Sequence, residues 1–153
     1  MKRGSKDRGP KKKPSVPAAP IAAAAPYAVE FSETAFAAYE SLYRKMQEAE
    51  GRADAHSAHH TVFRMIEEVI KVFIPRNPIN KDYGLSAPLS QFFRIKKGRY
   101  RICWAASSQQ RKVCILFISE TLRKQGDAND PYEIFQKLVD SGKLDSALER
   151  LKK

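Results

Sequence analysis

Four cationic side chains crowd one short stretch of the sequence, residues 93–102, and they are Arg94, Lys96, Arg99 and Arg101. A two-residue turn at residues 97–98 would join two antiparallel strands and place Arg94 opposite Arg101. Lys96 would then lie opposite Arg99, so that all four cations share one face of a hairpin. Like charges in direct opposition destabilise a sheet, and no Asp or Glu occurs between residues 83 and 119. This positive face indicates an anionic ligand; a solvated face without a ligand is the alternative.

The absence of carboxylates in this stretch limits the reactions that such a face could catalyse. Cleavage of a phosphodiester by two metal ions needs several carboxylates, and the basic hairpin has none nearby in the sequence, so we expect neither a metal nor a cofactor. RNA offers another route, because its own 2′-OH can attack the phosphate while cations stabilise the transition state. Crowding among arginines favours the neutral form of a lysine, which makes Lys96 the better candidate for the general base. Lys97 in the turn and Lys112 on the following strand are candidate RNA contacts.

The histidines and cysteines give weaker signals. His56, His59 and His60 gather at the start of a predicted helix, where they could hold a metal but more commonly form an exposed polar turn. Cys103 and Cys114 are too few for a disulfide framework and indicate reduced thiols in a cytoplasmic protein.

The net charge of +11 over 153 residues divides between a tail and a body. Residues 1–26 hold five of the nine prolines, seven of the 28 Lys and Arg residues and no aromatic residue. Such a segment cannot bury a core, so we expect a disordered basic tail at 1–26, able to add salt-sensitive attraction to RNA, and one globular domain at 27–153. No run of about 18 apolar residues is present to cross a membrane, and no apolar segment follows the basic start, so the chain reads as soluble and not secreted.

Hydrophobic periodicity predicts a strand at 27–31 followed by two amphipathic helices. Ser32 is the predicted N-cap of the first helix, with Phe31 and Phe36 as a hydrophobic staple, and Gly51 ends it. The second helix is predicted over 54–74, before Pro75, and it packs against the first as an antiparallel hairpin. Its predicted buried face consists of Val62, Ile66, Val69 and Phe73.

From residue 91 to residue 119 the hydrophobic period changes to two, which predicts an antiparallel meander of three strands. The last strand, 113–118, is apolar on both faces and is therefore expected to be central. Phe117 is expected on the same face as Trp104 and Tyr100, which are core residues. Residues 119–126 are a predicted helical turn. Asp130 and Pro131 open a helix that ends at Gly142, and a short amphipathic segment follows at 144–151.

The same residues carry a family resemblance. The stretch 93–102, the apolar strand after it, Thr121-Leu-Arg123 before a glycine, and Asp130-Pro-Tyr-Glu-Ile-Phe135 together resemble the YhaV-type toxins of the RelE/ParE superfamily. The match is clear over residues 90–142, and the earlier elements agree by their order. The proline-rich tail and the short turn at 97–98 depart from the family pattern.

The resemblance implies an α+β, RelE-like fold, in which an antiparallel sheet packs against an N-terminal helix hairpin and a C-terminal helix follows. It also implies a toxin of a type II toxin–antitoxin system: a ribosome-associated mRNA endoribonuclease that cleaves by 2′-OH attack and inhibits translation and growth. The implied partners are mRNA, the ribosome and a PrlF-like antitoxin with an AbrB-type DNA-binding domain, in a hetero-oligomer able to bind operator DNA.

The resemblance also carries site residues over to this sequence. The essential arginine of the family falls on Arg94, and other basic positions fall on Lys96, Arg99 and Arg101. A late arginine corresponds to Arg123. Tyr132 corresponds to a tyrosine that stacks on a base, the alternative being a helix residue half-buried in the core.

Two other functions remain open at this stage. A non-catalytic RNA-binding or ribosome-binding protein would use the same cations only to hold phosphates. A topoisomerase poison, as in ParE-like relatives, is less consistent with cations that lie on strands.

Overall fold

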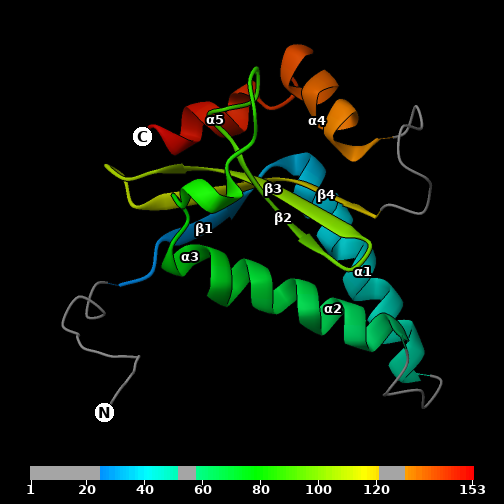
Figure 1. The fold of residues 1–153 in the computed structure, drawn as a ribbon. Helices are drawn as coiled ribbons and strands as arrows, with labels where there is room; N and C mark the ends of the chain where they lie inside the picture. The colour runs from blue at the N-terminus through cyan, green and yellow to red at the C-terminus, as the bar shows by residue number, and fades with distance from the viewer. Residues whose placement is uncertain (1–24, 52–57, 121–129) are drawn as a thin grey trace, which may run out of the picture.

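The computed structural model describes residues 25–51, 58–120 and 130–153 of the chain. The elements in chain order are β1 (Ala28–Phe31), α1 (Glu33–Gly51), α2 (Ala58–Glu68), the π-helical segment η3 (Val69–Phe73), α3 (Ile74–Arg76), the short 3₁₀ helix η4 (Lys81–Tyr83), β2 (Phe93–Lys97), β3 (Tyr100–Ser107), β4 (Lys112–Glu120), α4 (Pro131–Asp140) and α5 (Asp145–Leu151). A sheet lies between two helical layers, with α1 and α2 on one side and α4 and α5 on the other (Figure 1). The predicted turn at 119–126 falls outside the described residues, except that Ser119 and Glu120 continue β4.

The sheet has the strand order β1-β4-β3-β2. The predicted meander of β2, β3 and β4 and the central place of β4 are confirmed. The prediction of a purely antiparallel sheet is wrong at one edge, because β1 pairs parallel to β4, with Ala28 beside Lys112. The sheet is therefore mixed. A parallel neighbour requires a long crossover, and α1, α2 and the hairpin of β2 and β3 supply it.

Ser32 connects the first helix to the middle of the sheet. Its hydroxyl oxygen accepts a hydrogen bond from the Ala35 N–H at 3.0 Å, which confirms the N-cap. The same hydroxyl donates to the carbonyl oxygen of Leu116 at 2.9 Å. The predicted staple also forms, since the rings of Phe31 and Phe36 meet edge to face with centroids 5.8 Å apart.

The second helix departs from its prediction near its end. The five residues of η3 form i→i+5 hydrogen bonds, and each such turn holds about one residue more than an α-turn. Ile74 therefore takes the angular place that Phe73 would have in an uninterrupted helix. Ile74 is 1% exposed and Phe73 is 43% exposed, so the prediction that Phe73 is buried is wrong. The helical turn of α3 also continues through Pro75 to Arg76 instead of ending before the proline.

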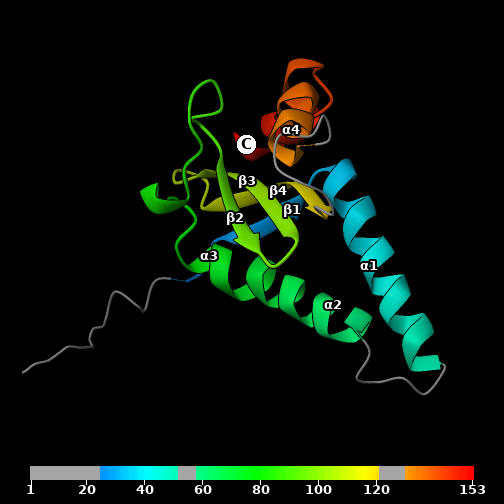
Figure 2. The ribbon, with the colours of Figure 1, turned by 45° about the vertical axis from the view of Figure 1, so that its right-hand side comes forward.

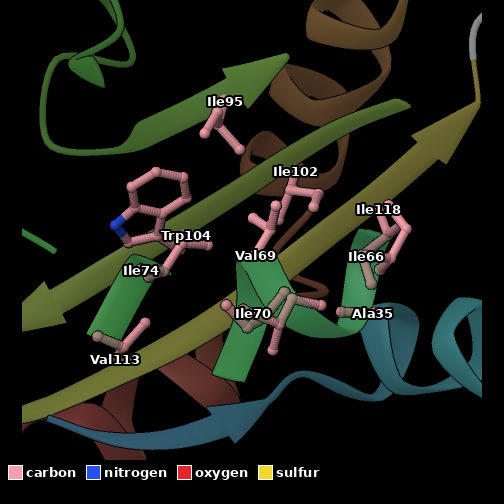
Figure 3. Close-up of a cluster of buried hydrophobic side chains, with 11 residues drawn as sticks. Ala35, Ile66, Val69, Ile70, Ile74, Ile95, Ile102, Trp104, Val113 and Ile118 are labelled. Carbon is pink, nitrogen blue, oxygen red and sulfur yellow. The ribbon is translucent and has the colours of Figure 1, made fainter. Parts of the chain in front are cut away.

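Two apolar clusters hold the layers together. One lies between the sheet and the α1–α2 layer, where Ile66, Val69 and Ile70 from the helix meet Ile102 and Ile118 from the strands (Figure 3). Trp104 belongs to it and donates from Nε1 to the carbonyl oxygen of Pro78 at 2.9 Å. This bond fixes the irregular segment 75–90 against the sheet.

The second cluster lies between the sheet and α4 and α5, and Phe135 is at its centre. It includes Phe117, which contradicts the prediction that Phe117 shares a face with Trp104. The cause is a β-bulge: Cys103 pairs with Phe117 but Trp104 pairs with Ile115. One extra residue on β4 turns all later side chains to the other face.

The C-terminal region forms two helices, one where Asp130 and Pro131 predict a helix and one over the short amphipathic segment predicted at 144–151. Asp130 caps α4 by accepting from the Tyr132 N–H at 2.8 Å, and Gly142 follows the helix with φ +80°, as expected for a residue after a helix end. α5 then packs Leu144, Ala147 and Leu151 against the sheet.

Candidate active site

The turn of the basic hairpin lies one residue later than predicted. Lys97 pairs with Tyr100, so Gly98 and Arg99 form the turn, and Gly98 has φ +57°. Lys96 therefore lies opposite Arg101, and Arg94 lies opposite Cys103. The predicted pairings of Arg94 with Arg101 and of Lys96 with Arg99 are wrong. The register differs from the predicted one by two residues. Because side chains alternate between the two faces of a strand with period two, Arg94, Lys96 and Arg101 still share one face.

Three cations share the face of the sheet that α4 covers, and we call the surface formed by Arg94, Lys96 and Arg101 the cationic face. Lys96 is exposed, and the two arginines are half-buried. Arg101 donates from Nη1 to the carbonyl oxygens of Gly98 and Tyr100, both at 3.2 Å, which holds its guanidinium beside the turn. In Figure 2 α4 lies above the sheet, and the turn of the hairpin of β2 and β3 points down toward α2.

Tyr132, in the first turn of α4, completes the face. Burial raises the pKa of the Tyr132 phenol above its ordinary value, Cys103 adds to the increase, and the positive charges of Arg94 and Arg101 oppose it. The phenol thus lies within electrostatic reach of both arginines. It stays protonated at neutral pH and can donate a hydrogen bond to an anion held by them.

Cys103 lies opposite Arg94 on the neighbouring strand β3, a pairing that the sequence did not predict. Its side chain is fully buried, and burial raises the pKa of the thiol to about 12, against a smaller opposing effect of Arg94. A thiol in this state is a poor nucleophile. Cys103 and Cys114 are both free.

Two other predicted residues lie away from the cationic face. Arg99 is exposed in the turn, with Nη1 3.9 Å from the Glu120 carboxylate. Lys97 lies on the opposite face of the hairpin, with its ammonium 6.0 Å from the centre of the Phe73 ring. Arg123 lies outside the described residues.

Lys112 is at the other end of the sheet. It pairs with Ser107, whereas Arg101 pairs with Ser119, so roughly 20 Å of strand separates Lys112 from the cationic face. Its ammonium is 3.5 Å from the Glu30 carboxylate. The structure therefore brings together Arg94, Lys96, Arg101 and Tyr132 but not Lys112.

Acidic and metal-binding groups are sparse around this face. In the described part of the chain, no carboxylate lies within ion-pair distance of Arg94, Lys96 or Arg101. Nor do the described residues contain a group of three or more His, Cys, Asp or Glu side chains that could hold a metal ion. His60 lies 3.4 Å from Glu50, and His56 is outside the described residues. The geometry suits an anion held by fixed cations and a phenol.

The arrangement of helices and strands is shared with solved toxin structures. A free-state variant of the Escherichia coli toxin RelE, in which two arginines are replaced by alanine, has a TM-score of 0.50 at 13% identity, over 76% of this chain and 98% of that chain. The isolated E. coli RelE toxin has a TM-score of 0.48 at 14% identity, over 75% and 97%. The RelBE2 toxin–antitoxin complex of Mycobacterium tuberculosis contains a chain with a TM-score of 0.46 at 20% identity, over 62% and 91%. No protein of curated function matches the chain.

The likeness with a TM-score of 0.50 shows the fold, which is the α+β fold of RelE-like toxins. The family follows from the sequence itself. Residues 29–153 match the model of the YhaV toxins, described as toxins with endonuclease activity, of toxin–antitoxin systems, and the chain belongs to this family. Among the described helices, none combines the length and apolar character needed to cross a membrane.

Proposed function

We propose that this toxin is a metal-independent, ribosome-associated mRNA endoribonuclease that cleaves by attack of the RNA 2′-OH on the adjacent phosphate and so inhibits translation and growth in the cytoplasm. The observation that carries the proposal is the cationic face: Arg94, Lys96 and Arg101 converge on one side of a hairpin with no carboxylate near them among the described residues. Its endonuclease activity follows from the family. The RNA substrate and the route of cleavage are our inference from the face.

The reaction changes no oxidation state, so its balance needs no oxidant or reductant. The 2′-oxygen forms a bond to phosphorus while the bond from phosphorus to the 5′-oxygen breaks, which leaves a 2′,3′-cyclic phosphate and a 5′-OH. The proton of the 2′-OH passes to a base on the protein, and the leaving 5′-oxygen takes up a proton. Between these steps the phosphorus is pentacoordinate and carries additional negative charge, which fixed cations stabilise.

The residues divide these tasks by their positions. Arg94 and Arg101 are half-buried and lie within electrostatic reach of Tyr132, so we assign to them the contacts with the non-bridging oxygens of the scissile phosphate. Lys96 is exposed beside Arg101 and is the candidate for proton transfer. Arg99 in the turn and Arg123 are further candidate cations, and Lys97 and Lys112 are candidate RNA contacts. Tyr132 can donate to the phosphate or stack on a neighbouring base.

The proposed protein partner is a PrlF-like antitoxin with an AbrB-type DNA-binding domain. Acidic or apolar segments of this antitoxin would cover the cationic face, since an uncovered site would cut RNA in resting cells. The resulting hetero-oligomer would bind operator DNA. A complex in which Arg94 keeps its full solvent accessibility would argue against direct occlusion.

The decisive experiment follows cleavage of mRNA by the purified protein in EDTA, with and without ribosomes. We expect cleavage to persist in EDTA and to yield 5′-OH ends that a polynucleotide kinase labels without prior phosphatase treatment. A substrate with a 2′-deoxy sugar at the cleaved position should stay intact. Arg94→Ala should lower cleavage at least tenfold, as loss of a transition-state contact worth roughly 1.4 kcal/mol or more requires.

Arg64→Ala is the matched control, because Arg64 is an exposed arginine on α2, outside the cationic face, and its loss changes the net charge equally. Abolition of cleavage by EDTA, or equal cleavage by the Arg94→Ala and Arg64→Ala variants, would refute the proposed mechanism. RNA that is bound in a salt-dependent manner but never cut would instead support the non-catalytic alternative.

A further inference from the structure

Phe73 is an aromatic side chain that the π-helical segment turns out of the core. The sequence pattern places Phe73 on the buried face of its helix, but the extra residue in η3 puts Ile74 there instead. Val72 and Phe73 are consequently 41% and 43% exposed. π-Helical segments are rare and are frequent at functional sites. An exposed phenylalanine created by such a segment therefore needs an explanation beyond packing.

The exposed ring separates two neighbouring hollows. The first, with a volume of about 320 Å³, is lined by Glu68, Val69 and Val72 of the helix and by Lys97 of the hairpin. The second, of about 390 Å³, is lined by Asn77, Asn80 and Tyr83. Phe73 and Arg76 line both hollows. We call the two together the Phe73 groove.

Both aromatic and cationic side chains line this groove. The Tyr83 ring meets the Phe73 ring edge to face, with centroids 5.8 Å apart and an interplanar angle of 82°. The Lys97 ammonium lies 6.0 Å from the centre of the Phe73 ring, and Arg76 adds a second cation. Aromatic rings beside cations are the combination that binds bases and phosphates of single-stranded nucleic acid.

Hydrogen-bonding groups complete the set. Asn77 and Asn80 line the second hollow, and Glu68 lines the first. One acceptor of Asn80 is already used, since its Oδ1 accepts from the Asp82 N–H at 2.9 Å. The remaining amide groups and the carboxylate can meet the polar edges of bases.

Strand β2 contributes one lysine to the groove and one to the cationic face. Lys96 and Lys97 are adjacent in β2 and point to opposite faces, the first toward the α4 side and the second toward Phe73. A single strand of RNA held at Lys96 can therefore pass around the turn and meet Lys97. Each hollow is at the small end of the range for ligand pockets, which suits one nucleotide rather than a helix of a protein partner.

We propose that the Phe73 groove is a second binding site for single-stranded RNA, in which nucleobases stack on Phe73 while Arg76 and Lys97 contact phosphates. The proposal rests on the proposed ribonuclease function, since it concerns nucleotides next to those held at the cationic face. The groove extends the contact beyond the cleaved bond. It thereby selects unpaired RNA long enough to reach both faces of the hairpin.

The test measures binding of RNA oligonucleotides that carry 2′-O-methyl groups, which block attack by the 2′-oxygen. Lengths of about 4 and about 12 nucleotides sample one face and both faces of the hairpin. We expect Phe73→Ala to weaken binding of the longer RNA by roughly tenfold, the effect of losing one stacked base. Arg76→Gln should lower the slope of log affinity against log salt by about 0.7.

Phe36→Ala is the matched control, since Phe36 is a phenylalanine on α1 that is 46% exposed and does not line the groove. It should bind both RNAs as the unmodified protein does. Equal affinity of the Phe73→Ala and Phe36→Ala variants for the longer RNA would overturn the proposal. That result would also favour a protein partner for the exposed ring.

A second measurement does not depend on the folding of a variant. Oligonucleotides containing 4-thiouridine should form photo-crosslinks to the unmodified protein within residues 73–83, and mapping by mass spectrometry would locate them. Crosslinks confined to β3, α4 and the residues of β2 before Lys97 would overturn the proposal. The proposed function fails separately: RNA that crosslinks at the groove but is never cut supports the groove and refutes the ribonuclease.

Discussion

Replacing Ser32 with alanine should destabilise the domain far more than an ordinary loss of a helix cap. Its side chain is 2% exposed and makes two hydrogen bonds, one from the Ala35 N–H and one to the Leu116 carbonyl. Loss of the cap costs about 1 kcal/mol. Leu116 is the extra residue of a bulge, so its carbonyl would be left buried without a partner, at about 1–3 kcal/mol. The expected total is a loss of about 2–4 kcal/mol in the free energy of unfolding.

Urea unfolding followed by the fluorescence of Trp104, the single tryptophan, would measure this loss. The midpoint should fall while the dependence on urea concentration stays constant. Ser141→Ala is the matched control, because the Ser141 hydroxyl also donates to a carbonyl, that of Leu138 at 2.9 Å, but at an exposed site. We expect about 0.5 kcal/mol there. Equal losses in the two variants would refute the argument that Ser32 satisfies a buried carbonyl.

Three further predictions concern single residues. The pKa of the Cys103 thiol is about 12 in the folded protein and 9.0 ordinarily, so the neutral thiol stabilises the folded state fully below pH 9 and this contribution is lost as the pH rises. By pH 10 the loss in the free energy of unfolding is about 1.4 kcal/mol. The urea midpoint of the Cys103→Ala variant should therefore decline less between pH 8 and 10 than that of the unmodified protein. Trp104→Phe leaves the buried Pro78 carbonyl without its donor and should cost about 1–3 kcal/mol in a thermal melt followed by circular dichroism; an unchanged melting temperature would contradict this. Gly142→Ala puts an alanine at a position whose backbone φ is +80°, so the free energy of unfolding should fall by about 1–2 kcal/mol. Gly51→Ala, where the added Cβ meets open space, should leave stability unchanged in the same assay.

Local patterns predicted the local features of this fold. The N-caps at Ser32 and Asp130 and the end of α4 at Gly142 depend on a few adjacent residues, and all are confirmed. The cationic face was also predictable, because alternation along a strand depends only on parity. The pairing within it was not, because Lys97-Gly98 and Gly98-Arg99 are both acceptable two-residue turns that differ only in where Gly98 stands.

The other differences have one physical origin. An extra residue in η3 exposes Phe73, and an extra residue on β4 turns Phe117 to the α4 side. Both insertions shift the phase of a hydrophobic pattern that is otherwise regular, and neither has a local composition that marks it. The parallel pairing of β1 with β4 depends on contacts between residues more than eighty positions apart. Such tertiary contacts are not encoded in any short window of the sequence.

The place of β1 beside β4 also bears on when the domain can fold during synthesis. Among the described strands β1 is made first, but its neighbour β4 begins at Lys112 and is made after β2 and β3. Closing so long a loop is slow and unfavourable until the partner exists. Tyr132, which completes the cationic face, is made later still. The cationic face is therefore complete only after Tyr132 has been made, so a growing chain that has not yet reached α4 does not carry a finished cationic face.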